Sequence, residues 1–252
     1  MRLIKTLTAL VAVFALSGCN LVQNEKAFGE RVRVYLVNHP EVIEEALNNL
    51  QQKQVAEAAS LTRSKLSENR AALVSDPRDF VAGNPKGAIT VVEFFDYRCG
   101  YCKAVQPEIE QLLAQNPDVR LVLKEFPILP DRDGRLGVSL RAARAALAAG
   151  TQGKYNAVHK ALMAQKTLDD DAINAILTAN GLNPATIKAN GEADAVTAHL
   201  TAVHSLGTTI GIQGTPAFII GETMVAGADI EALKAAIDDA RRNASKGVPK
   251  AG

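Results

Sequence analysis

The chain has 252 residues, of which 47% are hydrophobic and 22% are charged, and both fractions are typical of a globular protein rather than a disordered one. Its 28 Lys and Arg residues nearly balance its 27 Asp and Glu residues, so it has no broad basic field to hold nucleic acid. We therefore expect no nucleic-acid partner. The length allows one sizeable domain and a smaller appendage.

The first 18 residues have the pattern of an export signal. A basic start is followed by an apolar run at residues 7–16, which is too short for a permanent membrane helix. Residues 16–19, Leu-Ser-Gly-Cys, resemble the lipobox of bacterial lipoproteins, which implies cleavage before Cys19 and lipid attached to that residue. Cleavage after Ser17 is the alternative and leaves Cys19 as a free thiol. Both interpretations predict export to the periplasm, and the first predicts a lipoprotein anchored to the membrane at Cys19.

Residues 19–73 are expected to form a tether and an N-terminal helical segment. Apolar residues recur at helical spacing on both sides of Pro40, a residue suited to the first turn of a second helix. The second helix has apolar positions close to a 3-4 spacing, among them Ile43, Leu47, Leu50 and Leu61. We interpret it as an oligomerisation segment and expect a homo-oligomer, because a long helix with few neighbours in sequence needs a surface for this stripe. Packing against the rest of the chain is the alternative.

Residues 74–245 have the pattern of a βαβ unit, a helical stretch and a final ββα unit. Residues 89–95 are β-branched and aromatic, which indicates a buried strand, and residues 119–126 indicate another. A helix between two such strands predicts that they are parallel. Residues about 130–206 are interpreted as a helical insertion, and residues 246–252 as a flexible tail. This order predicts an α/β thioredoxin fold with an inserted helical subdomain, preceded by the N-terminal helical segment.

The motif Cys99-Gly100-Tyr101-Cys102 directly follows the first of these strands and begins a helix. Backbone N–H groups and the helix dipole at such a position stabilise a thiolate on Cys99, with a pKa of roughly 3.5–7.5. The spacing lets Cys102 reach Cys99 and resolve a mixed disulfide. A zinc site is the competing interpretation, but it needs four ligands in recurring spacings, and the histidines of this sequence are single. We expect a redox pair, with no metal and no cofactor.

A second motif, Gly-Thr-Pro-Ala-Phe at residues 214–218, stands just before a strand pattern. Proline cannot donate to a sheet ladder, so Pro216 marks a special backbone position. With the strand that leads into the cysteine motif and the helical insertion, this motif resembles the DsbA-like thioredoxin family over residues 78–243. The resemblance implies that Pro216 is cis and faces the cysteines, that the backbone of Thr215 pairs with substrate, and that Gly100 and Tyr101 also bind substrate. An ordinary trans turn is the alternative.

Glu93 and Lys124 lie on the two predicted neighbouring strands, where ionisable side chains are costly unless they are paired. The resemblance implies an acid and a lysine beneath the active site, which help proton transfer to or from Cys102. A solvent-facing pair of strand residues is the alternative.

The N-terminal segment narrows the resemblance. Residues 37–47 resemble the beginning of the suppressor-of-copper-sensitivity protein C (ScsC) type of this family, which implies a trimer and disulfide isomerase activity, although the lipobox and the weak heptads depart from it. We expect a disulfide isomerase or reductase that acts on exported client proteins with cysteines and exchanges electrons with a membrane redox partner. A dithiol oxidase is the first alternative. A copper-sequestering or scaffold lipoprotein is the second.

Overall fold

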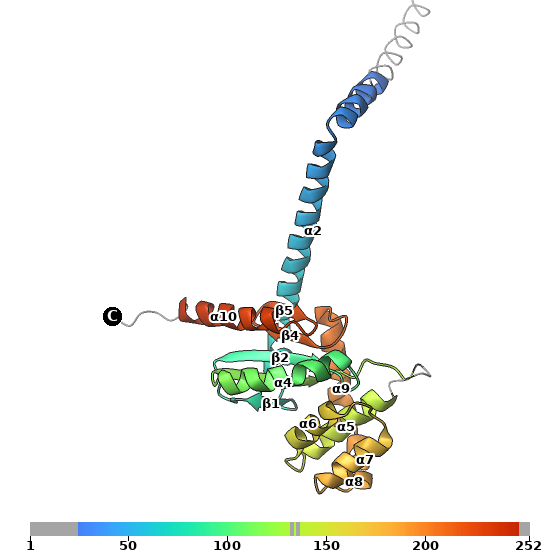
Figure 1. Ribbon diagram of the computed structural model, residues 1–252, viewed down its shortest axis with the longest axis vertical. Coiled ribbons are helices and arrows are strands. Elements are labelled where there is room, and N and C mark those ends of the chain that lie inside the picture. The colour runs from blue at the N-terminus through green and yellow to red at the C-terminus, as the bar shows by residue number, and fades with distance from the viewer. Residues whose placement is uncertain (1–24, 132–133, 135–136, 247–252) are drawn as a thin grey trace, which may run out of the picture. The chain divides into compact units, whose positions relative to one another are not determined.

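The computed structural model describes residues 25–131, 134 and 137–246, and Figure 1 draws its helices and strands. The chain divides into two compact units, Met1–Ala59 and Ser60–Gly252. The predicted signal segment, Cys19 and residues 247–252 of the predicted tail lie outside the described residues. Within the described ranges, no helix is both long enough and apolar enough to cross a membrane.

The described part of the first unit is helical. Residues 25–38 form one helix, and α2 (Pro40–Glu68) follows and continues into the second unit. Pro40 suits the first position of α2, because a proline there lacks an N–H group that would in any case have no intrahelical partner. Large apolar side chains of this unit are exposed, and we call them the exposed apolar set: Phe28, Val32, Val34, Tyr35, Val37, Ile43, Leu47, Leu50 and Val55.

The second unit is built on a five-stranded sheet in the order β1-β3-β2-β4-β5. Its strands are β1 (Phe80–Gly83), β2 (Ile89–Phe95), β3 (Val119–Glu125), β4 (Ala217–Ile220) and β5 (Thr223–Ala226). β2 and β3 are parallel and are joined by the crossover helix α4 (Gly100–Gln115), while the other neighbouring strands are antiparallel. The predicted βαβ unit is therefore confirmed, and β2 lies in the middle of the sheet.

Helices cover both faces of this sheet. α4 and α10 (Ile230–Lys246) pack on one face, and α3 (Arg70–Val74) and α9 (Asp194–Ile210) pack on the other. Because side chains alternate along a strand, Val91 and Phe95 of β2 enter the core beneath α4, whereas Val92 and Phe94 enter the core beneath α3 and α9. A strand covered on both faces has a nearly continuous apolar sequence, as residues 89–95 do.

In the described chain, four helices between β3 and α9 form a helical insertion (Figure 1): α5 (Gly137–Gly150), α6 (Tyr155–Ala164), α7 (Asp170–Ala179) and α8 (Pro184–Gly191). The alanine-rich α5 packs against the other three, and most of its residues are buried. Phe80 of β1 stacks on Tyr155 of α6 with ring centroids 3.8 Å apart, so an aromatic pair joins the insertion to the sheet.

Candidate active site

The two cysteines of the second unit lie where β2 gives way to α4. Cys99 is the N-cap residue of α4, and its backbone N–H donates to the carbonyl of Asp96 at 3.0 Å. Cys102 lies in the first turn of the same helix, and both residues are buried free thiols. The sequence spacing therefore puts two sulfur atoms at one helix N-terminus, where backbone N–H groups favour a thiolate.

The turn before the cysteines is organised by a residue that the sequence analysis missed, the buried Asp96. Its Oδ1 accepts from the backbone N–H of Arg98 at 2.7 Å and from the hydroxyl of Ser139 at 2.8 Å. Its Oδ2 accepts from the backbone N–H groups of Ile128 and Leu129 at 2.9 and 3.0 Å. A buried carboxylate needs such donors, and three of these four bind the turn to the segment after β3 and to α5. The sequence signal that could have identified Asp96 is its position between a buried strand and a cysteine motif.

The proline motif lies against the first cysteine. The peptide bond between Thr215 and Pro216 is cis, and the carbonyl of Thr215 accepts from the Sγ of Cys99 at 3.1 Å. The carbonyl of Pro216 in turn accepts from the backbone N–H of Gly227 at 2.8 Å, which fixes the loop beside β5. Two motifs that are more than a hundred residues apart in sequence therefore form one site.

The segment between the cysteines is open to solvent. Tyr101 is 72% exposed, and a Cβ atom added to Gly100 would meet no other atom within 4 Å. A surface groove of about 600 Å³ between α4 and the start of α10 is lined in part by Tyr101, Glu108 and Ile230. The predicted substrate-binding residues at this position thus stand at the edge of a groove.

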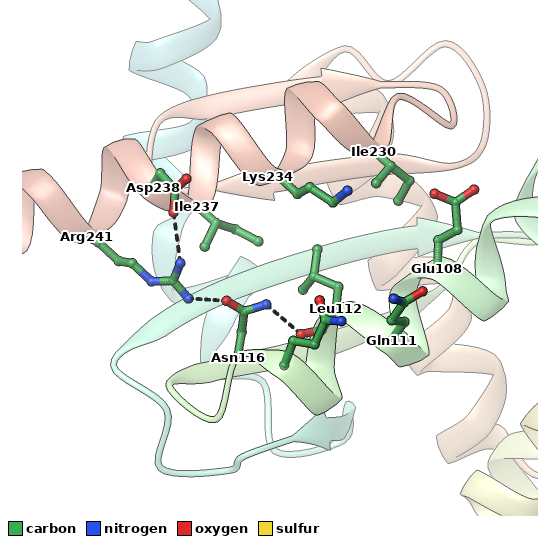
Figure 2. Close-up of a pocket in the computed structure, with 10 residues that line it drawn as sticks. Glu108, Gln111, Leu112, Asn116, Ile230, Lys234, Ile237, Asp238 and Arg241 are labelled. Atoms are coloured by element: carbon green, nitrogen blue, oxygen red, sulfur yellow. Dashed lines mark hydrogen bonds and ion pairs between the residues drawn. The ribbon is translucent and has the colours of Figure 1, made fainter.

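Glu108 and Ile230 also line a second cavity, of about 250 Å³, between the same two helices. Figure 2 shows this cavity and the hydrogen bond that the guanidinium of Arg241 donates to Oδ1 of Asn116. The two atoms are 2.7 Å apart. The guanidinium of Arg241 also forms an ion pair with Asp118 at 2.7 Å, so this end holds α10 against the segment after α4. Neither Tyr101 nor the two cysteines line this cavity.

Hydrogen bonds give the two thiols opposite acidities. The hydrogen bond from the Cys102 thiol has the largest effect on Cys99. With contributions from the side chain of Thr215 and from the backbone of Cys102 and Tyr101, it lowers the pKa of Cys99 to about 5, against the opposing effect of burial. The same thiol–thiol bond, followed by burial, raises the pKa of Cys102 well above its usual value. At neutral pH, Cys99 is therefore the nucleophile and Cys102 holds its proton.

We expect Cys99 in the reduced protein to be alkylated at a rate that is half-maximal at about pH 5. A free cysteine reaches this point at about pH 8.5, because the thiolate is the reactive form. Alkylation rates and the ultraviolet absorbance of the thiolate measure the midpoint independently. In Cys102→Ala the midpoint should move upward, since the strongest hydrogen bond is lost. A midpoint above about pH 8 in the unaltered protein would contradict the arrangement described.

Glu93 lies on β2 beneath the cysteines. Its side chain is 1% exposed, and neither carboxylate oxygen has a hydrogen-bond partner among the described residues. Burial raises the pKa of Glu93 to about 8. Its charge, when present, also raises the pKa of Cys102, so the carboxyl and the second thiol influence each other.

Lys124 requires a correction, because it does not pair with Glu93. In the parallel register Glu93 lies opposite Leu123, and alternation sends Lys124 to the other face of the sheet. There its Nζ forms an ion pair with Asp79 and donates to the carbonyl of Ala72 at 2.6 Å. The solvent-facing alternative is also wrong, since both Glu93 and Lys124 are 1% exposed. Lys124 therefore belongs to a buried ion pair remote from the cysteines.

A second buried glutamate on the Glu93 face, Glu125, was not singled out from the sequence. Its Oε1 accepts from the phenols of Tyr97 and Tyr155, each at 2.8 Å. The phenol of Tyr97 also contacts Nδ1 of His159 at 3.0 Å. The only signal available was a third charged residue, after Arg120 and Lys124, at the end of a strand whose other residues are apolar. Among the residues that the structure describes, no group of three or more His, Cys, Asp or Glu side chains is arranged to hold a metal ion.

A reactive dithiol at a helix N-terminus, opposite a cis-proline loop, defines the active site of a thioredoxin-fold thiol–disulfide oxidoreductase domain. Residues 90–238, more than half of the chain, match the family model of the DSBA-like thioredoxin domain. The chain therefore belongs to the DSBA-like thioredoxin family. Residues 24–57 match the model of the copper resistance protein ScsC N-terminal domain. The predicted fold, family and ScsC-type N-terminal segment are confirmed.

Solved structures of similar proteins cover most of the chain. A thioredoxin-like oxidoreductase from Silicibacter pomeroyi DSS-3 is 41% identical over 69% of this chain and 98% of that one, with a TM-score of 0.64. BcfH of Salmonella enterica Typhimurium is 29% identical over 89% of this chain and 98% of that one, with a TM-score of 0.69. A linker-deletion mutant of Proteus mirabilis ScsC is 28% identical over 87% of this chain and 95% of that one, with a TM-score of 0.63.

Curated relatives match over shorter stretches. A Na(+)/H(+) antiporter, NhaA 1 of Salinispora arenicola, is 37% identical over 93 residues, which are 37% of this chain and 14% of the antiporter. A putative protein-disulfide oxidoreductase of Rickettsia conorii is 26% identical over 176 residues, with 66% of this chain and 61% of that protein covered. The chain therefore spans less than two thirds of the length of each of these relatives.

Proposed function

We propose that the protein is an exported disulfide isomerase or reductase that acts on client proteins with cysteines. The observation that carries the proposal is the acidic Cys99 thiol at the N-terminus of α4, 3.1 Å from the carbonyl of Thr215. The shallow groove lined by Tyr101 and the start of α10 leaves room for a client segment beside the cysteine motif. The strand-end position of the Thr215 loop supports backbone pairing with that segment, as β-augmentation does elsewhere.

In the first step, the Cys99 thiolate attacks a client disulfide. The client S–S bond breaks, a mixed disulfide forms between Cys99 and the client, and the other client sulfur leaves as a thiolate. In isomerisation, another client thiolate then attacks the mixed disulfide and releases Cys99 unchanged. In reduction, Cys102 instead attacks the Cys99 sulfur of the mixed disulfide. The client leaves as a reduced dithiol, and the Cys99–Cys102 disulfide that forms must itself be reduced. We assign that reduction to a membrane redox partner.

Glu93 supports this scheme as the group that exchanges a proton with Cys102. Cys102 must lose its proton when it attacks and regain one when it is displaced. Glu93 is buried on the same side of β2 as Cys102, and its raised pKa of about 8 places its titration near neutral pH, where a general acid–base group is most effective.

Replacing Cys102 with Ala should trap the first intermediate. Without the resolving thiol, mixed disulfides between Cys99 and clients accumulate, and non-reducing electrophoresis followed by mass spectrometry detects them. The double variant Cys99→Ala/Cys102→Ala is the matched control and should form none. Failure of the single variant to trap any client would contradict the oxidoreductase proposal and favour a copper-binding or scaffold role.

The direction of exchange has one rival interpretation. A Cys99 pKa of about 5 stabilises the reduced dithiol, which is a property of strong oxidants and favours a dithiol oxidase. Refolding of a client with scrambled disulfides separates the two, because an isomerase restores activity without net oxidation. A protein whose dithiol is mostly oxidised in cells, and which fails this refolding assay, would be the oxidase.

We also propose self-association through the exposed apolar set of the first unit. The match of residues 24–57 to the ScsC N-terminal domain and the exposure of Leu47 and Leu50 support it. A homo-oligomer buries these side chains, with a trimer as the state that the family resemblance implies. Enclosed active sites would shield the Cys99 thiolate from oxidising partners and so favour isomerisation.

Replacing Leu47 and Leu50 with Glu should convert the oligomer to a monomer. Two charges in a buried apolar seam remain unpaired, so association should weaken by at least about 100-fold, as measured by sedimentation. The control Asn48→Glu/Gln52→Glu adds the same charges to the opposite face of α2 and should leave the oligomer intact. We expect the monomer to lose isomerase activity but keep dithiol exchange. An unaltered mass for the Leu47→Glu/Leu50→Glu variant would reject this interface.

Localisation follows from the same proposal. A 30% identical solved relative is a periplasmic thioredoxin-like protein from Salmonella enterica serovar Typhimurium, which supports periplasmic location for this chain. We propose a lipid anchor at Cys19 in addition. Release of Cys19→Ser from the membrane fraction is the expected result, and equal fractionation of both forms would reject the anchor.

A further inference from the structure

Two buried carboxyl groups share one face of the central sheet. Glu93 is on β2 and Glu125 is on β3, and in the parallel register Phe95 lies opposite Glu125 while Glu93 lies opposite Leu123. Alternation therefore directs both glutamates to the face covered by α4. Each is at most 2% exposed. Two like charges in such a place are costly, so at neutral pH the pair holds fewer than two charges.

The hydrogen bonds of the pair are unequal. Oε1 of Glu125 accepts from the hydroxyls of Tyr97 and Tyr155, each at 2.8 Å. Each phenol has a single proton, so the contact of Tyr97 with His159 at 3.0 Å requires the imidazole Nδ1 to carry the donated proton. Glu93, in contrast, has no hydrogen-bond partner in the described chain. Burial raises the pKa of both carboxyl groups to about 8, but at Glu125 the hydrogen bonds from the two phenols oppose that rise, and Glu93 has no such donor. Of the two, Glu125 is therefore the carboxyl whose hydrogen bonds stabilise a negative charge.

We propose that Glu125 carries the negative charge of this pair and thereby keeps Glu93 protonated, so that Glu93 can exchange one proton with Cys102. The inference rests on the dithiol exchange proposed above and assigns to Glu125 the role of a positioning residue that acts through Glu93. Tyr97, two residues before Cys99, and Tyr155 of the insertion hold it in place. The insertion therefore contributes to the proton chemistry of the active site.

The step balances with groups already present. When a thiolate attacks Cys99 of the oxidised protein, the Cys99–Cys102 bond breaks and its electron pair goes to the sulfur of Cys102. Glu93 gives its proton to that sulfur, which leaves a neutral thiol and two buried carboxylates, Glu93 and Glu125. Repulsion between the carboxylates favours return of the proton to Glu93 when Cys102 attacks again. One proton therefore moves back and forth within the site.

The other titratable groups around the pair have fixed roles in the structure. Asp96 is held by its four donors, and its charge adds to the repulsion on Glu125. Lys103 donates to the carbonyls of Leu162 and Gln165 at 3.1 and 2.5 Å, which directs it to the end of α6. Burial lowers the pKa of His159 to about 4, so its imidazole is neutral at physiological pH.

The test measures how fast reduced glutathione opens the Cys99–Cys102 disulfide of the full-length protein, across the pH range in which thiols and carboxyls titrate. The rate is divided by the concentration of glutathione thiolate, so that the remaining pH dependence reports on the protein. We expect this corrected rate to fall as Glu93 loses its proton. In Glu125→Gln the fall should occur at lower pH, by on the order of one unit, because the repelling charge is gone.

Three further variants make the result decisive. Tyr155→Phe removes one donor to Glu125 and should shift the fall in the same direction by less. Glu93→Gln should abolish the fall, and adding Glu125→Gln to it should change nothing more, since the two act in series. Glu222→Gln, in the exposed turn between β4 and β5, is the control and should leave the profile unchanged.

Each outcome separates this inference from the proposed function. If glutathione does not open the disulfide of the unaltered protein, the proposed function fails. If opening proceeds normally but Glu125→Gln and Tyr155→Phe keep the original profile, only the role of Glu125 is rejected. A uniform loss of rate at every pH in these variants would also reject it, because it indicates a structural role alone. If Glu125→Gln fails to fold, Tyr155→Phe decides the question.

Discussion

Replacing Cys99 with Ala should abolish disulfide exchange, with the rate falling on the order of 10³-fold or more, to the uncatalysed background. The reason is that no other sulfur in the site can take its place. Cys102 is fully buried, and its pKa is raised well above the usual value, so it remains a protonated thiol at neutral pH. Reduction of a client disulfide in the presence of a thiol reductant measures the loss.

The third cysteine provides the matched control for that experiment. Cys19 is outside the described residues, and we propose it as a lipid anchor. The Cys19→Ala variant should therefore be soluble without detergent and keep the full rate of disulfide exchange. Exchange that persisted in Cys99→Ala but disappeared in Cys19→Ala would move the chemistry away from α4 and contradict the assignment of the active site.

Replacing Lys124 with Met should destabilise the protein by about 3–5 kcal/mol without changing the titration of Cys99. The Lys124 ammonium is buried against Asp79 and donates to the carbonyl of Ala72, which belongs to α3. Without the ammonium, the carboxylate of Asp79 is buried with its main counter-charge missing. Urea unfolding measures the loss as a lower midpoint with an unchanged m-value.

A double variant distinguishes the ion pair from simple packing. Asp79→Leu/Lys124→Met removes both charges, and it should recover most of the lost free energy of unfolding because no uncompensated charge is left. A loss below about 1 kcal/mol for Lys124→Met would contradict a buried pair and would match an exposed one. A changed midpoint for the titration of Cys99 would indicate that Lys124 acts on the active site. That result would contradict the position of Lys124 on the opposite face of the sheet.

The sequence was sufficient for the parts of the site that depend on local pattern. The apolar run of residues 89–95 and the cysteines that follow it predict a strand and a helix N-terminus, and the structure has both. The position of Pro216 opposite Cys99 came from family resemblance, since nothing local to either motif specifies a contact across more than a hundred residues.

The features that the sequence did not disclose depend on register and on distant partners. Whether Lys124 faces Glu93 is decided by the alignment of β2 with β3, and one residue of register reverses the face. Glu125 accepts a hydrogen bond from Tyr155, which is thirty residues away in the helical insertion, so the local sequence does not indicate this contact. Leu66 and Leu73, within the segment expected to form the oligomerisation helix, instead belong to the core beneath α9, because helical periodicity is the same whether a stripe meets a sheet or another chain.

The four hydrogen bonds to Asp96 have a consequence for protein engineering. Three of them fasten the active-site turn to residues 128, 129 and 139, so a minimal thioredoxin made by excising the helical insertion would lose the Ser139 donor and leave Oδ1 of Asp96 with only the N–H of Arg98. The dipeptide Gly100-Tyr101 takes no part in these hydrogen bonds, and the space around Gly100 is open. Libraries that retune the redox properties of this scaffold should therefore vary the dipeptide and keep the insertion intact.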